Sequence, residues 1–155
     1  MAPELKKLSL QEVELLKKAP LLVSILIAGA DGEIDRNEIK GAMETARKKA
    51  RGKSSLQAFY QDVSEDFEDK LKVLLQNYPS LPEPRGKQIS TELAALSGIF
   101  NKVDGSLPMD IYKSLKTLAL TIAKSSGGIF GLKTIGPEEA MFIDLKMIQP
   151  PSSTR

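Results

Sequence analysis

Four carboxylates lie within eight residues in the first third of the chain, and such a cluster could hold a hard divalent cation. They are Asp31, Glu33, Asp35 and Glu38. Their Asp-Gly-x-Ile-Asp-x-x-Glu spacing matches the second half of an EF-hand loop. The first half does not match, because Ile27 and Gly29 stand where such a loop needs side-chain oxygens. The pattern therefore predicts a weak, hydrated site for calcium, magnesium or manganese, to which Glu139 could add an oxygen.

Capping is the alternative role for the same acids, and it needs no metal. Asp35 and Glu38 have the spacing of a capping box, in which each side chain accepts from the other residue's backbone N–H. Asp31 precedes Gly32 in a turn signal, where an aspartate commonly bonds the turn backbone. A helix N-terminus also favours acids and disfavours a cation on the helix axis. The sequence favours capping over metal binding and leaves both open.

A cluster of five cations in seven residues follows near the predicted end of that helix. It comprises Arg47, Lys48, Lys49, Arg51 and Lys53. Such a cluster could bind phosphate on a nucleic acid, a nucleotide or a lipid, although cations at a helix C-terminus also complement the helix dipole. The acidic run between Asp62 and Asp69 indicates a bipolar surface, which suits docking to a protein or to another copy of the chain.

Composition removes most familiar active sites. The 155 residues include no Cys and no His, which excludes disulfides, thiolate nucleophiles, imidazole metal sites and Ser-His-Asp triads. The formal charge is only +2, and aromatic residues make up 5% with no Trp, so we expect no nucleic-acid partner. We expect a non-enzymatic protein. The enzymatic alternative is a hydrolase-like protein that uses Glu38 and Glu139 as a carboxylate pair, which requires the two helix starts to converge.

Apolar residues recur at three- and four-residue spacing along most of the chain, and no segment shows the alternation of a strand. A capping box at Ser9 and Glu12 starts the first helix, and Pro20 is expected to interrupt it after Lys18. The next segment, from Leu21 to Ala30, has almost no polar face and must be buried. The predicted fold class is all-α, a compact bundle of about seven helices. The expected helices cover residues 9–18, 21–30, 35–51, 55–78 (one or two helices, with Ser64 as a cap), 89–103, 107–123 and 137–148, with an irregular loop over 125–134.

Two segments of the chain have a similar sequence pattern. Residues 27–38 and 122–139 each combine a buried helix, a glycine turn, an isoleucine and a new helix start with a glutamate in its first turn. This indicates two similar helix-turn-helix units in a single domain of residues 1–149, with unit one at about 9–78 and unit two at about 83–149. Residues 150–155 are expected to form a disordered tail.

The segment from Ala28 to Glu38 reads Ala-Gly-Ala-Asp-Gly-Glu-Ile-Asp-Arg-Asn-Glu. It resembles the Ala-x-Ala-Asp-Gly-x-Ile-x-x-x-Glu signature of the tellurite-resistance TerB-like family, whose members are helical bundles built from two such units. The resemblance implies a cytoplasmic, non-enzymatic protein associated with stress responses, with metal ions proposed to bind acidic residues of the two units. Ser126 stands where the second unit would need an acid, which argues against a symmetric metal site.

The expected surroundings of the protein follow from its apolar segments. Residues Met1 to Lys7 lack the apolar stretch of a secretory signal, and Leu21 to Ala30 is half the length of a membrane span. We therefore expect a cytoplasmic protein with no membrane span. The expected function is an interaction or sensing module for a protein partner, or for a second copy, tuned by weak divalent-cation binding. The alternatives are anionic-polymer binding through Arg47 to Lys53 and the carboxylate-pair enzyme.

Overall fold

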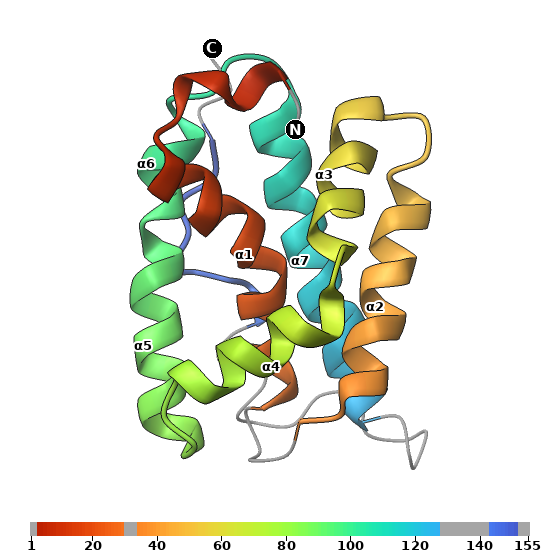
Figure 1. Cartoon of the computed structure of the whole chain (residues 1–155), viewed down its shortest axis with the longest axis vertical. Helices are drawn as coiled ribbons and strands as arrows, with labels where there is room; N and C mark the ends of the chain where they lie inside the picture. Colours follow the sequence, from red (N-terminus) through yellow and green to blue (C-terminus); the bar gives the residue numbers. More distant parts are fainter. Residues whose placement is uncertain (1–2, 30–33, 128–142, 152–155) are drawn as a thin grey trace.

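The computed structural model describes residues 3–29, 34–127 and 143–151. Every regular element in these residues is a helix, and the helices pack side by side as a bundle, which confirms the predicted all-α class (Figure 1). The helix count and the two-unit repeat stay predictions, because the second turn of the repeat falls on residues 128–142. The elements in chain order are η1 (Pro3–Lys7), α1 (Leu10–Ala28), α2 (Arg36–Lys49), α3 (Ser54–Ser64), α4 (Phe67–Asn77), α5 (Pro82–Ala94), α6 (Leu96–Phe100) and α7 (Leu107–Gly127).

Helix α1 is the apolar centre of the bundle. Every residue from Ala19 to Ala28 is buried, and α1 packs against α7, α5 and α2 (Figure 1). The prediction that Pro20 ends the first helix is wrong, because α1 continues through it. A proline inside a helix costs about 3 kcal/mol, whereas burying each Leu, Ile or Val side chain yields ~1.5–3 kcal/mol, so burial of the segment outweighs this cost. Neither α1 nor any other helix of the described part is long and apolar enough to cross a membrane.

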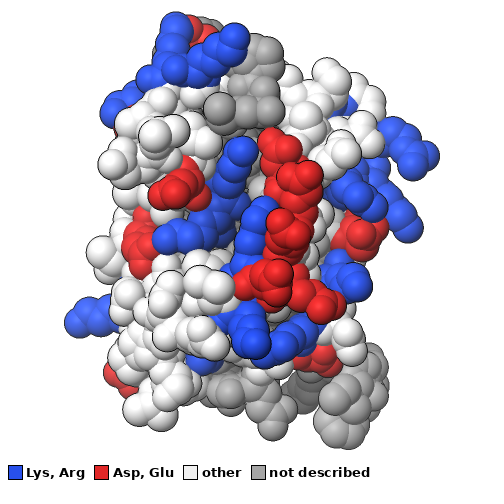
Figure 2. Space-filling model, in the orientation of Figure 1, with Lys and Arg blue, Asp and Glu red and all other residues white. Residues whose placement is uncertain are grey.

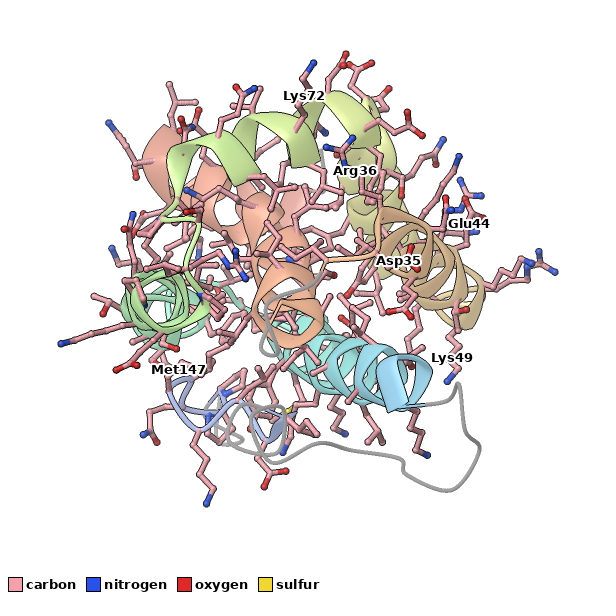
Figure 3. The ribbon with its side chains drawn as sticks, turned by 90° about the horizontal axis from the view of Figure 1, so that it is seen from below. Asp35, Arg36, Glu44, Lys49, Lys72 and Met147 are labelled. Atoms are coloured by element: carbon pink, nitrogen blue, oxygen red, sulfur yellow. The ribbon has the colours of Figure 1, made fainter. Side chains whose placement is uncertain are left out.

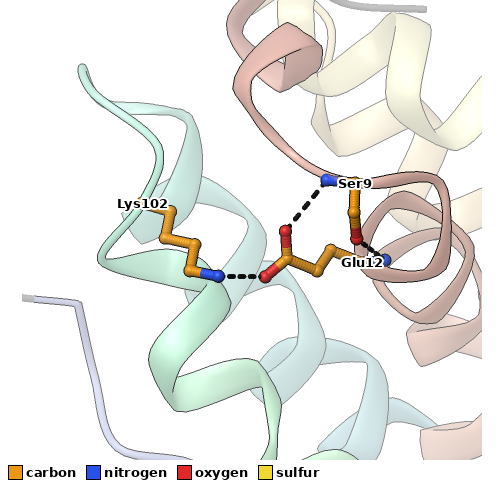
Figure 4. A network of polar contacts seen from close by, with 3 residues as sticks. All are labelled: Ser9, Glu12 and Lys102. Atoms are coloured by element: carbon orange, nitrogen blue, oxygen red, sulfur yellow. Dashed lines mark hydrogen bonds and ion pairs between the residues drawn. The ribbon is translucent and has the colours of Figure 1, made fainter.

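The start of α1 is fixed by the predicted capping box. The Glu12 N–H donates to Ser9 Oγ at 3.1 Å, and the Ser9 N–H donates to Glu12 Oε1 at 2.9 Å. Lys102, which follows α6, donates its ammonium to the other carboxylate oxygen of Glu12 (Figure 4). The hydrogen bond from Lys102, and then the one from the Ser9 backbone, lower the pKa of Glu12. The cap therefore also holds the first helix to the turn between α6 and α7.

A buried arginine joins the end of α1 to the start of α5. Arg85 is only 6% exposed, and its guanidinium donates to the carbonyl oxygens of Gly29 at 2.9 Å and Ser80 at 3.0 Å. Burial lowers the pKa of Arg85. A Cβ atom at Gly29 would collide with that guanidinium and would lie 2.8 Å from the carbonyl oxygen of Ile25. The contact therefore requires glycine at this position.

The longer predicted segments divide where the chain changes direction. The segment 55–78 forms two helices with the break after Ser64, and Asp66 takes a left-handed φ of 51° immediately before α4. The segment 89–103 divides at Ala95 into α5 and α6. In contrast, α7 continues to Gly127, so the predicted loop is helical over residues 125–127.

The C-terminal described segment also differs from the prediction. The sequence predicts a helix through Ile148, but residues 144–149 form turns, and Leu145 has a positive φ of 48°. The side chains of Leu145 and Ile148 are nevertheless buried in the core. A three-residue spacing is compatible with one side of a helix and also with one side of a tight turn. The spacing of Leu145 and Ile148 therefore does not distinguish the two, and the predicted helix is wrong here. The predicted start of this helix at Pro137 lies outside the described residues.

Substitution Gly29→Ala is expected to lower the free energy of unfolding by ~2 kcal/mol, because the added Cβ displaces the Arg85 guanidinium. Gly41→Ala is the matched control. Gly41 lies inside α2 with open space where a Cβ would stand, so alanine should there stabilise the protein by about 0.5–1 kcal/mol. Urea unfolding followed by circular dichroism measures both. Equal effects of the two substitutions would show that the Arg85 contact does not impose this constraint.

The contribution of Glu12 to stability is expected to depend on pH. Because the pKa of Glu12 is lowered in the folded protein, its contribution is complete above the ordinary glutamate pKa of about 4.3 and is lost as the pH falls through the lower folded value. Removing the ammonium with Lys102→Met should raise the pKa of Glu12, which a carboxyl NMR titration measures directly. An unchanged pKa in this variant would contradict the role given to the Lys102 contact.

Candidate functional site

Only part of the predicted cation site lies within the described residues. The predicted ligands outside them are Asp31, Glu33 and Glu139. Asp35 stands at the start of α2 (Figure 3), and its Oδ1 accepts from the N–H groups of Asn37 at 2.8 Å and Glu38 at 3.3 Å. The predicted capping role of Asp35 is therefore confirmed. Glu38 is half-buried in the first turn of the same helix.

The cation site and the carboxylate pair stay predictions. Within residues 3–29, 34–127 and 143–151, no three acidic side chains are grouped so that they could share a metal ion. Asp35 and Glu38 are the two predicted ligands that the structure places. The enzymatic alternative needs Glu139, which lies outside the same ranges.

The five predicted anion-binding residues separate onto two sides of the C-terminal half of α2. Those beside α3 are Arg47, Lys48 and Arg51, and those beside α7 are Lys49 and Lys53. Figure 3 shows Lys49 on the side of α2 that faces α7. Arg47, Lys48 and Lys49 lie in the last turn of α2, whereas Arg51 and Lys53 follow the helix, so the turn toward α3 sets the two groups together with the helical period. The cations therefore do not form one continuous stripe.

A hollow of about 280 Å³ lies between α2 and α3, and every residue of its lining is basic or carries an amide. The lining residues are Arg47, Lys48, Arg51, Gln57 and Gln61. The turn between the two helices contains Gly52, whose φ of 93° lets the chain reverse so that α3 returns along α2. On α3 the two glutamines are one helical turn apart and share a face. This α2–α3 hollow therefore brings donors from both helices to one place.

Two of the three cations in the α2–α3 hollow make no ion pair within the described residues. Arg47 donates to the Glu44 carboxylate at 2.9 Å, whereas Lys48 and Arg51 are exposed and have no such contact. No described carboxylate lines the hollow. An anion entering it would therefore meet the charges of Lys48 and Arg51 and two amides, while Glu44 already neutralises part of the charge of Arg47.

The hollow between α2 and α7 is smaller and partly neutralised. Its volume is about 140 Å³, and within it the Lys53 ammonium pairs with Asp110 at 3.3 Å. The hydroxyl of Ser114 in its wall already donates to the Ile111 carbonyl and contacts the Tyr60 hydroxyl. The remaining charged and polar lining residues are Lys49, Lys113 and Thr117. This hollow is the weaker candidate for an anion.

Two carboxylates of the predicted acidic run pair with lysines from other helices. Asp62 pairs with Lys17 of α1 at 3.5 Å, and Glu68 pairs with Lys40 of α2 at 3.9 Å. Figure 2 shows acidic side chains in a column with basic side chains on both sides. The charges on this face therefore interleave instead of separating into two poles.

The sequence indicates the five cations but does not single out the two glutamines. The four-residue spacing of Gln57 and Gln61 is the signal that places them on one face of α3. The spacing does not show which helix this face of α3 lies beside, because that depends on the direction that the turn at Gly52 gives to α3.

Comparison with known proteins adds no assignment. No family model matches the chain, and neither a curated protein nor a solved structure matches it. The resemblance to the TerB-like family therefore stays a prediction, and it rests on residues 28–38.

Asp35→Ala is expected to lower the free energy of unfolding by about 1 kcal/mol, because it removes the acceptor of two N–H groups at the start of α2. Asp35→Ser is the matched variant and should keep most of the stability, since serine also caps helices. Unfolding is measured with and without millimolar calcium, magnesium or manganese. Capping alone gives the same loss in every buffer, whereas a loss that grows with cation concentration would support the predicted cation site.

Proposed function

We propose that this chain is a non-enzymatic interaction module that binds an acidic segment of a partner protein in the α2–α3 hollow. The observation that carries the proposal is the lining of the hollow, where three cations and two amides stand together and no described residue adds a carboxylate. A carboxylate-rich segment supplies the complementary charge. Complementarity of this kind sets the choice of partner and the association rate more than the affinity itself.

The residue types in the α2–α3 hollow suit carboxylates. An arginine guanidinium can bond both oxygens of one carboxylate, so Arg47 and Arg51 offer fork-shaped donors. Lys48 adds a flexible point charge. The amides of Gln57 and Gln61 can donate to a side-chain oxygen or a peptide carbonyl and can accept from a peptide N–H. An acidic peptide presents carboxylates, peptide carbonyls and peptide N–H groups, which are the partners that these side chains bind.

A protein segment suits this surface better than a nucleic acid does. The cations of α2 lie on both sides of the helix, and Asp110 neutralises part of the group beside α7. A protein that binds along a phosphate backbone contacts it through a continuous run of cations, and these two separate groups do not form such a run. Neither hollow is lined by a described aromatic side chain on which a base could stack.

Two further parts of the proposal rest on the sequence alone. One is tuning by a divalent cation at residues that precede or open α2: Asp31, Glu33, Asp35 and Glu38. The other is a cytoplasmic role in stress responses, which the resemblance to the TerB-like family implies. The first part is testable through the cation dependence described for Asp35.

Binding of a short fluorescent peptide of Glu, Asp and Ser is expected to be measurable by anisotropy and to weaken as salt is raised. The double variant Lys48→Gln with Arg51→Gln should weaken it about fivefold, because each exposed ion pair contributes ~0.2–1 kcal/mol. Lys72→Gln is the matched control, since Lys72 is an exposed lysine of α4 outside both hollows (Figure 3).

Three outcomes would contradict the proposal. The first is the absence of peptide binding at low salt, and the second is an equal loss in the Lys72→Gln control. The third is tighter binding of a single-stranded oligonucleotide with a steeper salt dependence, which would favour the anionic-polymer alternative.

A further inference from the structure

A groove of about 450 Å³ runs between α1 and α4, away from the α2–α3 hollow. Helix α4 crosses in front of α1 at this point (Figure 1). The groove is lined by Glu14, Lys17, Lys18 and Leu21 from α1 and by Asp69, Lys70, Val73 and Leu74 from α4. The surface it exposes is almost wholly apolar, so the lysines contribute mainly their methylene stems. We refer to it as the α1–α4 groove.

Helix α4 leaves apolar surface uncovered in this groove. Leu71 and Leu74 are the residues that α4 buries, whereas Val73 is 53% exposed. Val73 stands beside Leu74 and opposite Leu21 of α1 in the lining. Leu21 and Leu74 are themselves buried, so Val73 and the methylene stems of the lysines supply most of the apolar surface that the groove exposes. Apolar surface rimmed by charged groups is typical of a surface that docks a partner.

The three lysines of the α1–α4 groove already have acceptors. Lys17 pairs with Asp62 at 3.5 Å, and Lys18 pairs with Glu92 at 3.1 Å. Lys70 donates its ammonium to the backbone carbonyl of Asp62 at 2.9 Å. An occupant that relied on these ammonium groups would have to displace contacts that hold α1, α3, α4 and α5 together.

Unlike Lys17 and Lys18, the two carboxylates of the groove have no ion-pair partner among the described residues. They are Glu14 and Asp69, and both are exposed. One stands on α1 and the other on α4, so negative charge flanks the apolar floor from both walls.

We propose that the α1–α4 groove binds a basic amphipathic helix of a partner protein. Such a helix presents apolar side chains at every third and fourth position on one face, and this face fits against Val73 and the methylene stems of the groove's lysines. Lysine or arginine side chains beside the apolar stripe then pair with Glu14 and Asp69. The lysines of the groove keep their present acceptors.

Other occupants fit the same observations less well. A fatty acid would bring its carboxylate close to Glu14 and Asp69. A second copy of this chain would need an exposed apolar stripe with basic flanks. The large apolar side chains exposed among the described residues are Leu10, Val73, Leu81 and Leu120, and no described helix carries two of them, so none presents such a stripe. The partner is therefore a different protein.

The test uses two synthetic helical peptides that share a leucine face and differ only in carrying Lys or Glu beside it. Binding to the full chain is measured by fluorescence anisotropy, and the contact is mapped by amide NMR shifts. We expect the Lys peptide to bind with shifts on α1 and α4, and the Glu peptide to bind about tenfold more weakly. Raising the salt concentration should narrow the difference between the two peptides.

Variants separate the apolar floor from the charged walls. Val73→Arg should weaken binding of the Lys peptide at least tenfold, because it fills the floor and adds a repelling charge. Glu14→Gln with Asp69→Asn should remove the preference for the Lys peptide. Leu10→Arg is the matched control, since Leu10 is 81% exposed and lies outside the groove. Circular dichroism confirms that each variant is folded.

The proposal is overturned if the Lys peptide does not bind, if both peptides bind equally to the wild type, or if Val73→Arg leaves binding unchanged. A wild-type dimer that Val73→Arg dissociates would also overturn it, by identifying a second copy as the occupant. None of the substituted residues lines the α2–α3 hollow, so a failure of this proposal is distinguishable from a failure of the function proposed above.

Discussion

The end of α1 is buried, and Arg85 supplies a hydrogen-bond donor there to the carbonyl of Gly29, the residue that follows the helix. A helix buried on all sides leaves its last carbonyl groups away from water, where an unpaired group costs about 1–3 kcal/mol. The guanidinium bonds the carbonyls of Gly29 and Ser80, so the end of α1 and the first turn of α5 are joined. Burying a guanidinium opposes its charge, which the lowered pKa of Arg85 reflects. The two carbonyls replace the water it loses, and only glycine leaves room for this exchange.

The parts of the fold that could be predicted from the sequence are those set by neighbours in the chain. The caps at Ser9 and Asp35 are local contacts between residues two or three positions apart. The box at Ser9 and Glu12 forms in full, and of the box predicted at Asp35 and Glu38 the bond accepted by Asp35 is confirmed. The prediction that Pro20 ends the first helix is wrong because two effects compete there. The unfavourable effect of proline on a helix is local, whereas the burial that outweighs it depends on the packing of the whole bundle. Arg85 could not be recognised, because its acceptor at Gly29 is 56 positions away and the sequence shows only one more charged residue.

The same distinction between contacts of chain neighbours and contacts of distant residues applies to the candidate site. The number of cations near the end of α2 is visible in the sequence, but Arg51 lies past the last residue of the helix, so helical periodicity does not fix its place beside Arg47. Their meeting with Gln57 and Gln61 depends on the reversal at Gly52, which no periodicity reveals. The α1–α4 groove is still less predictable, because it results from incomplete coverage of α1 by a helix that buries little of its own surface.

The two proposed surfaces are joined at the turn between α3 and α4. Gln61 lines the α2–α3 hollow, and the next residue, Asp62, contacts both Lys17 of α1 and Lys70 of α4. Asp66 gives the turn a left-handed conformation, which aspartate adopts more readily than most non-glycine residues. If α4 moves away from α1 to admit a helix, it either breaks the contact between Lys70 and Asp62 or carries the end of α3 with it. Either change alters the wall on which Gln61 stands, so the geometry of one surface depends on the geometry of the other.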